Sequence, residues 1–200
     1  MATTYQTNTL LSIKIILDLE KKKRTLADAL EQYASQYPHR NLLHTITLGT
    51  LRHYQLLDHW VRQKCKLKPK DQNIRLLILI TLYQCHFMDK KSSRAAIQSA
   101  VSCCDALNRQ WAKGLVKAVL ESSIRTPEAF TTQESLQYSI PTWLKESIEK
   151  QYPPAKAQAI YQAWLHDRKH VGIRENRPGQ PPNTQIPQLE KHPVIYPSSN

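Results

Sequence analysis

A run of eight residues, Leu76 to Tyr83, constrains the fold more than any other part of the sequence, because Thr81 is its only polar member. A segment that is apolar on all sides must be buried on all sides. The run itself fits a buried strand or a buried helix, but the 17 residues from Asp71 to Phe87 contain neither Gly nor Pro. That length favours a helix at the centre of a bundle. Because the whole chain has only 4 Gly among 200 residues, tight β-hairpins are disfavoured, and we expect an all-α fold.

Other stretches with apolar residues at helical spacing lie on both sides of this run. The apolar phase changes near Gly49, which predicts a bend or a close helix crossing there. Asn108 is expected to separate two helices of an αα-hairpin. The predicted helical stretches are 9–19, 25–33, 42–61, 71–87, 93–107, 111–120, 141–152 and 155–164.

The composition divides the chain into three parts. Residues 5–126 carry most of the helical patterns, and residues 136–170 hold a further helix pair interrupted by Pro153 and Pro154. Six of the 12 prolines lie beyond Arg177. We therefore expect a helical domain over 5–126, a small helical linker subdomain over 136–170, and a loose Pro-rich tail over 171–200.

Charge indicates the kind of partner. The sequence has 28 Lys and Arg against 16 Asp and Glu, a net charge of +12, which suits a polyanion. Nucleic acid is favoured over a membrane, since no stretch approaches the roughly 20 apolar residues of a spanning helix. An ordinary basic protein is the alternative. The four cysteines lack CxxC spacing and the histidines are scattered, so we expect reduced thiols in a cytoplasmic protein without a metal site.

The clearest organised charge is a basic stripe formed by Arg109, Lys113 and Lys117, spaced four residues apart on one predicted helix. Its opposite side is expected to carry apolar residues, including Trp111 and Leu115, so that this tryptophan is not free to stack on a base. A solvated surface is the alternative explanation of the stripe. Other candidate contacts to RNA phosphates are Arg52, Lys64, Lys66 and Arg174. Further basic clusters are Lys21 to Arg24 and Lys90, Lys91 and Arg94.

Three motifs, in this order, resemble those of the NusB family. Residues 49–52 read G-T-L-R and resemble its G-x-L-R motif, and residues 82–84 match its L-Y-Q motif. Residues 113–121, K-G-L-V-K-A-V-L-E, are similar to K-G-L-V-N-A-V-L-R, with Lys117 and Glu121 in place of Asn and Arg. The resemblance implies an antiparallel helical bundle that binds RNA. The arginine-rich first helix of that family is not matched, since Lys14 is the only cation in residues 1–19.

Two further motifs resemble a branch of the family found in ribosomal-RNA 5-methylcytosine methyltransferases. Residues 140–144, I-P-T-W-L, resemble the H-P-x-W-L motif that follows their NusB-like domain, and residues 172–176, G-I-R-E-N, resemble W-L-R-x-N at the entry to their catalytic module. Catalysis there is implied to use a cysteine nucleophile and S-adenosylmethionine on a glycine-rich loop. This sequence contains neither, so we expect no catalytic residues, no cofactor and no enzyme activity of its own.

The resemblance implies a domain that positions structured ribosomal RNA through phosphate contacts. Three alternatives stay open. The chain is an adaptor that binds a ribosomal protein, as antitermination factors of this family do; it is a subunit completed by a separately encoded catalytic chain; or it is a truncated methyltransferase without a function.

Overall fold

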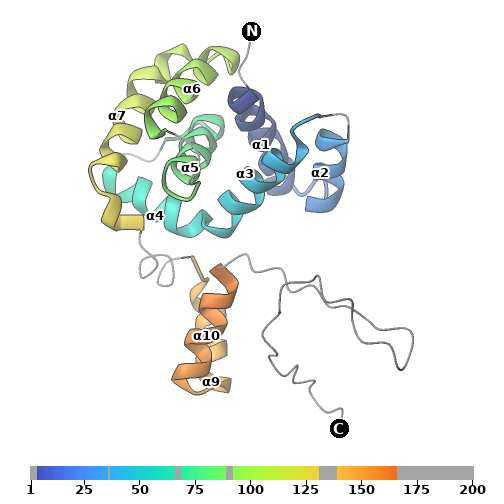
Figure 1. Cartoon of the computed structure of the whole chain (residues 1–200), viewed down its shortest axis with the longest axis vertical. Coiled ribbons are helices and arrows are strands. Elements are labelled where there is room, and N and C mark those ends of the chain that lie inside the picture. Colours follow the sequence, from blue (N-terminus) through green and yellow to red (C-terminus); the bar gives the residue numbers. More distant parts are fainter. Residues whose placement is uncertain (1–3, 36, 66–68, 89–91, 131–138, 166–200) are drawn as a thin grey trace, which may run out of the picture. The chain divides into compact units, whose positions relative to one another are not determined.

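The computed structural model describes residues 4–165 except 36, 66–68, 89–91 and 131–138 (Figure 1). All regular structure in these residues is helical, which confirms the predicted all-α fold. The helices are α1 (Thr4–Glu20), α2 (Leu26–Ala34), α3 (Arg40–Arg52), α4 (Tyr54–Lys64), α5 (Gln72–His86), α6 (Ser93–Ala106), η1 (Gln110–Ala112), α7 (Lys113–Ile124), η2 (Pro127–Phe130), α9 (Thr142–Gln151) and α10 (Pro154–Leu165). None of the described helices is both long enough and apolar enough to cross a bilayer.

Helix α5 is the centre of the bundle. It contains the apolar run of the sequence, which is buried from Leu76 through Gln84, and it contacts α1, α3, α4, α6 and α7 (Figure 1). Asp71 caps the start of the helix, and its carboxylate accepts hydrogen bonds from the amides of Asn73 and Ile74. Burial on every side explains why all its faces are apolar.

The long helical pattern over 42–61 is two helices. Helix α3 ends at Arg52, α4 begins at Tyr54, and His53 lies at the break between them. The expected close crossing is at Gly49, which is buried where α3 passes α5: a Cβ atom there would overlap the ring of Tyr83. Two of the family motifs therefore meet in space, because the glycine of one makes room for the tyrosine of the other.

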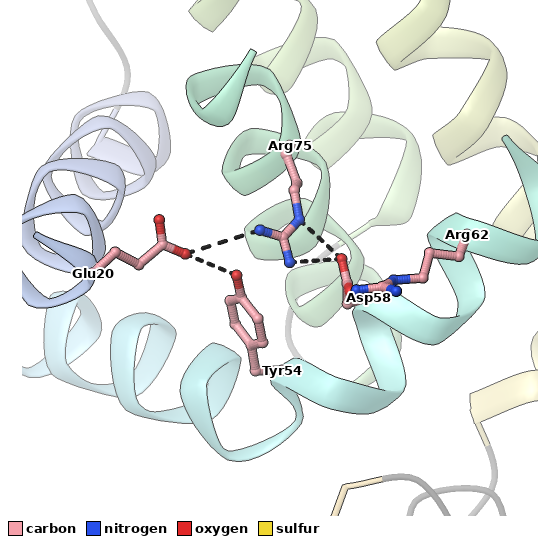
Figure 2. A network of polar contacts seen from close by, with 5 residues as sticks. All are labelled: Glu20, Tyr54, Asp58, Arg62 and Arg75. Atoms are coloured by element: carbon pink, nitrogen blue, oxygen red, sulfur yellow. Dashed lines mark hydrogen bonds and ion pairs between the residues drawn. The ribbon is translucent and has the colours of Figure 1, made fainter. Parts of the chain in front are cut away.

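A polar network joins three helices on one side of the bundle (Figure 2). Arg75 of α5 contacts Asp58 of α4 at 2.8 Å and Glu20 of α1 at 4.0 Å. Tyr54 donates a hydrogen bond to Glu20 at 2.9 Å, and Arg62 donates to Asp58 at 2.7 Å. Because the side chain of Asp58 is 9% exposed and that of Arg75 is 15% exposed, each depends on the other for compensation of its charge.

Two histidines pack inside an aromatic cluster. The ring of His53 stacks on Phe87 with centroids 4.1 Å apart, and His86 stacks on Phe130 at 3.9 Å while contacting the hydroxyl of Ser123 at 3.0 Å. Burial lowers the pKa of each histidine from 6.5 to about 4. Both imidazoles are therefore neutral near pH 7.

Helices α9 and α10 form a pair with a small apolar cluster of its own. Ile140, Ala157 and Tyr161 are its buried members, and the Tyr161 hydroxyl donates to the carbonyl of Lys145 at 3.2 Å. The division into domains at 5–126 and 136–170 stays a prediction. The predicted tail, 171–200, lies outside the described residues.

Candidate nucleic-acid interface

Helices α6 and α7 form the predicted αα-hairpin. Asn108 makes the turn with φ of 55°, a left-handed conformation that asparagine tolerates. The 3-10 turn η1 follows, and α7 begins at Lys113. Because the two helices are antiparallel, the first turn of α6 lies beside the last turn of α7.

The surface between these two helices is hollowed into a groove of about 640 Å³, which we call the α6–α7 groove. It combines apolar side chains with polar groups that include three cations and one carboxylate. The lining residues are Arg94, Ile97, Gln98 and Val101 of α6, Lys117, Glu121 and Ile124 of α7, and Arg125 just after it.

The positive charge of the groove is available to a ligand. Arg94 and Arg125 are exposed, and neither makes an ion pair with another residue in the described part of the chain. Lys117 and Glu121 are 3.9 Å apart, with side chains 61% and 47% exposed. An exposed pair at that separation is weak, so it competes poorly with a bound anion.

Arg109 and Lys113 have carboxylate partners within the fold. Arg109 Nε donates to Asp71 Oδ2 at 2.5 Å and thereby ties the hairpin turn to the start of α5. Burial by itself would raise the pKa of Asp71, but the hydrogen bonds from Arg109 and from two backbone amides outweigh it and hold the pKa below its ordinary value. Lys113 Nζ lies 2.7 Å from Asp105 of α6.

The basic stripe expected on one helix is therefore divided. Arg109 precedes η1, outside α7, while Lys113 and Lys117 lie on α7. The apolar side of α7 also differs from the expectation. Trp111 is 65% exposed and Leu115 is 37% exposed, whereas Val116 is fully buried. The prediction that Trp111 is a core residue was wrong, because the 3-10 turn rotates it away from the buried face of the helix that follows.

The remaining predicted contacts do not line the α6–α7 groove. Arg52 ends α3 and lines a second hollow of about 390 Å³ together with Glu20 and Trp164. Lys64 ends α4, and its ammonium group lies 5.9 Å from the centroid of the Trp60 ring. Lys66 and Arg174 lie outside the described residues.

Arg125 was not predicted, and Arg94 was predicted only as one member of a basic cluster, without a link to Lys117 or Arg125. Arg94 and Arg125 are 31 positions apart in the sequence and meet only through the hairpin. The signal that identifies them is the hairpin register: the antiparallel pairing that places Asp105 beside Lys113 also places the start of α6 beside the end of α7. Charge spacing within one helix does not contain that information.

Comparison with known proteins agrees with this architecture. Residues 6–125 match the model of a family described as the NusB family. Ribosomal RNA small subunit methyltransferase B of Pseudomonas syringae pv. tomato is 30% identical over 120 residues, 57% of this chain and 27% of that protein. The proteins of the same name from Pectobacterium carotovorum subsp. carotovorum and Serratia proteamaculans are 33% and 28% identical, over 69% and 80% of this chain and 33% and 38% of their own lengths.

The chain thus spans between 27 and 38% of the length of these relatives. The family model accounts for most of the matched residues. The matched portion is therefore the NusB-family domain at residues 6–125.

Proposed function

Because this chain belongs to the NusB family, we propose that it is an RNA-binding domain that contacts structured small-subunit ribosomal RNA, without methyl transfer of its own. The α6–α7 groove is its main contact with the RNA backbone. Action on ribosomal RNA places it in the cytoplasm.

One observation carries this proposal: the groove gathers three cations around a single carboxylate, on a chain of net charge +12. Two of those cations, Arg94 and Arg125, make no ion pair with any residue that the structure describes, so a phosphate has no such pair to displace. Arginine forms bidentate hydrogen bonds with phosphate, so a groove with two arginines suits an RNA backbone better than one with two lysines would. The names of the similar proteins, which act on small-subunit ribosomal RNA, support that class of RNA.

The candidates from the sequence take different roles in this proposal. Lys117 contacts phosphate directly, whereas Arg109 and Lys113 hold the hairpin that forms the groove. Arg52 and Lys64 are peripheral phosphate contacts. Lys66 and Arg174 are further candidates of the same kind.

The test measures binding of the full chain to small-subunit ribosomal-RNA fragments over a series of salt concentrations. The variant carries Arg94→Gln, Lys117→Gln and Arg125→Gln together. Each phosphate contact that the variant loses means that binding releases about one counterion fewer. The slope of log affinity against log salt should therefore become shallower by about 2–3. Arg109 is left intact, since its replacement would disturb the start of α5.

A matched control removes the same charge from another surface. Lys14, Lys21 and Lys23 are exposed and lie on or just after α1, so their replacement by Gln also lowers the net charge from +12 by three. We expect the control to keep most of the wild-type salt slope. Equal losses in both triple variants would refute the groove as the site. Salt-independent or absent binding in the wild type would refute RNA binding and favour the adaptor that binds a ribosomal protein.

A further inference from the structure

Resting on the proposed RNA-binding function, we infer that the α6–α7 groove binds unpaired nucleotides and that Glu121 selects guanine among them. The groove is more than a basic surface. Its accessible apolar residues, Val101 and Ile124, and its one carboxylate have no use in contacts to phosphate, and they are what the inference explains.

The apolar residues suit the face of a base. Val101 of α6, which is half-buried, and Ile124 of α7, which is 41% exposed, line the groove between its charged groups, whereas Ile97 is 6% exposed and belongs to the core. Packing the face of an exposed base on such side chains removes apolar surface from water, which favours binding. In a paired helix the base faces are stacked on one another and are not accessible, so only an unpaired loop or bulge can use this surface.

The charges along α7 alternate in sign. Lys117, Glu121 and Arg125 follow one another at intervals of four residues, and all three line the groove. Four helical residues span about 6 Å, so the backbone positions of Lys117 and Arg125 lie about 12 Å apart along the axis, with that of Glu121 between them. A short stretch of RNA backbone can lie with its phosphates near the two cations. Glu121 would repel a phosphate that lay between the two cations. The group of the RNA that faces Glu121 is therefore a base.

The carboxylate determines which base is preferred. Ionised Glu121 only accepts hydrogen bonds. Unpaired guanine offers two adjacent donors, N1–H and the N2 amino group, which fit the two oxygens of one carboxylate. Cytosine and adenine offer a single amino group, and the one imino donor of uracil lies between two carbonyl oxygens that a carboxylate repels. The preference expected is therefore strongest for guanine and weakest for uracil.

The experiment uses fluorescence anisotropy of the full chain with labelled RNA oligonucleotides of about eight residues, one composed of uridine alone and one with two central guanosines. Guided by the discrimination of bidentate base contacts, we expect the wild type to bind the guanosine oligonucleotide roughly tenfold more tightly. Glu121→Ala should bring this ratio close to one. It should do so by weakening binding of the guanosine oligonucleotide while strengthening that of the uridine one.

The affinity changes of opposite sign for the two oligonucleotides distinguish selection of a base from a general change in the charge of the protein. Removing any carboxylate makes the protein more positive, so the control Glu31→Ala, at an exposed position of α2, should raise both affinities slightly. If Glu121→Ala also raises both equally, guanine selection is refuted while the proposed function stands. A duplex that competes as well as the single strands, or an acidic peptide that binds the groove in place of RNA, would overturn the inference about unpaired nucleotides. Binding of both oligonucleotides that does not depend on Arg94 and Arg125 would refute the groove as the site, and absence of binding to any RNA would refute the proposed function itself.

Discussion

Two glycines in helices make the packing of this bundle testable by the same substitution at two positions. Gly49 lies in α3 against α5, where an added Cβ would overlap the ring of Tyr83. Gly114 lies in α7, where an added Cβ has no neighbouring heavy atom within 4 Å. We expect Gly49→Ala to destabilise the protein and Gly114→Ala to stabilise it slightly.

The magnitudes follow from two opposing terms. Alanine is favoured over glycine within a helix by up to about 1 kcal/mol, and this gain applies at both positions. At Gly49 the ring of Tyr83, which is 8% exposed and held among core residues, must move, and such overpacking typically costs about 1–3 kcal/mol or more. We expect a net loss of about 2 kcal/mol for Gly49→Ala and a gain of about 0.5 kcal/mol for Gly114→Ala.

Urea unfolding followed by far-UV circular dichroism measures both. With a slope of about 2 kcal/mol per molar urea, the midpoint should fall by about 1 M for Gly49→Ala and rise by a few tenths of a molar for Gly114→Ala. In a Tyr83→Leu background the ring is absent, so Gly49→Ala should lose most of its effect. If Gly49→Ala is as stable as the wild type, or remains equally destabilising without the ring, the close packing of these two motifs is refuted.

Three further predictions concern polar groups. Arg109→Gln should lower the free energy of unfolding by about 1–2 kcal/mol, because it removes the charged partner of the partly exposed Asp71, and an unchanged urea midpoint would contradict this role. Asp58→Ala should lower the free energy of unfolding by about 2–4 kcal/mol and lower the Tm, because the largely buried guanidinium of Arg75 then keeps only the carboxylate of Glu20, 4.0 Å away. A Tm equal to that of the wild type would show that the network does not stabilise the fold. Acidification should destabilise the fold through His53, whose pKa is about 4 in the folded protein and about 6.5 in the unfolded chain. As the pH falls below 6.5, the unfolded chain takes up a proton that the folded protein does not. The stability present above pH 6.5 is therefore lost, by up to about 3 kcal/mol, as the pH falls towards 4. Urea titrations from pH 7.5 to 4 check this, and a slope that is no flatter in His53→Phe would exclude that histidine as the cause.

Most helices follow from local patterns in the sequence. The central helix α5 was predictable because a segment apolar on every side and free of Gly and Pro has few other stable placements. Asn108 ended the predicted helix because it adopts a left-handed conformation. The change of apolar phase near Gly49 predicted a bend or a close crossing, but it did not predict that the helix breaks four residues later, at His53.

The candidate site was predictable in part. Lys117 lies in the α6–α7 groove, but Arg94 at the start of α6 and Arg125 just after α7 come together only because the hairpin is antiparallel. Arg125 was not predicted, and Arg94 was predicted only as part of a basic cluster. Arg109 and Lys113 had the right spacing for a basic stripe, yet both are paired with carboxylates. Spacing along one helix cannot reveal a partner that another segment supplies.

The sequence by itself determined the all-α class, the central buried helix, the hairpin and the family, because these depend on periodicity, on turn-forming residues and on motifs that are each local. Only the tertiary structure decided which positive charges are available to an anion. Asp71 and Asp105 neutralise two cations that look free in the sequence, while Arg94 and Arg125 line a groove and make no ion pair within the described part of the chain. The physical reason is that an ion pair needs its two groups within about 4 Å, and that proximity is set by how helices pack and not by their distance along the chain.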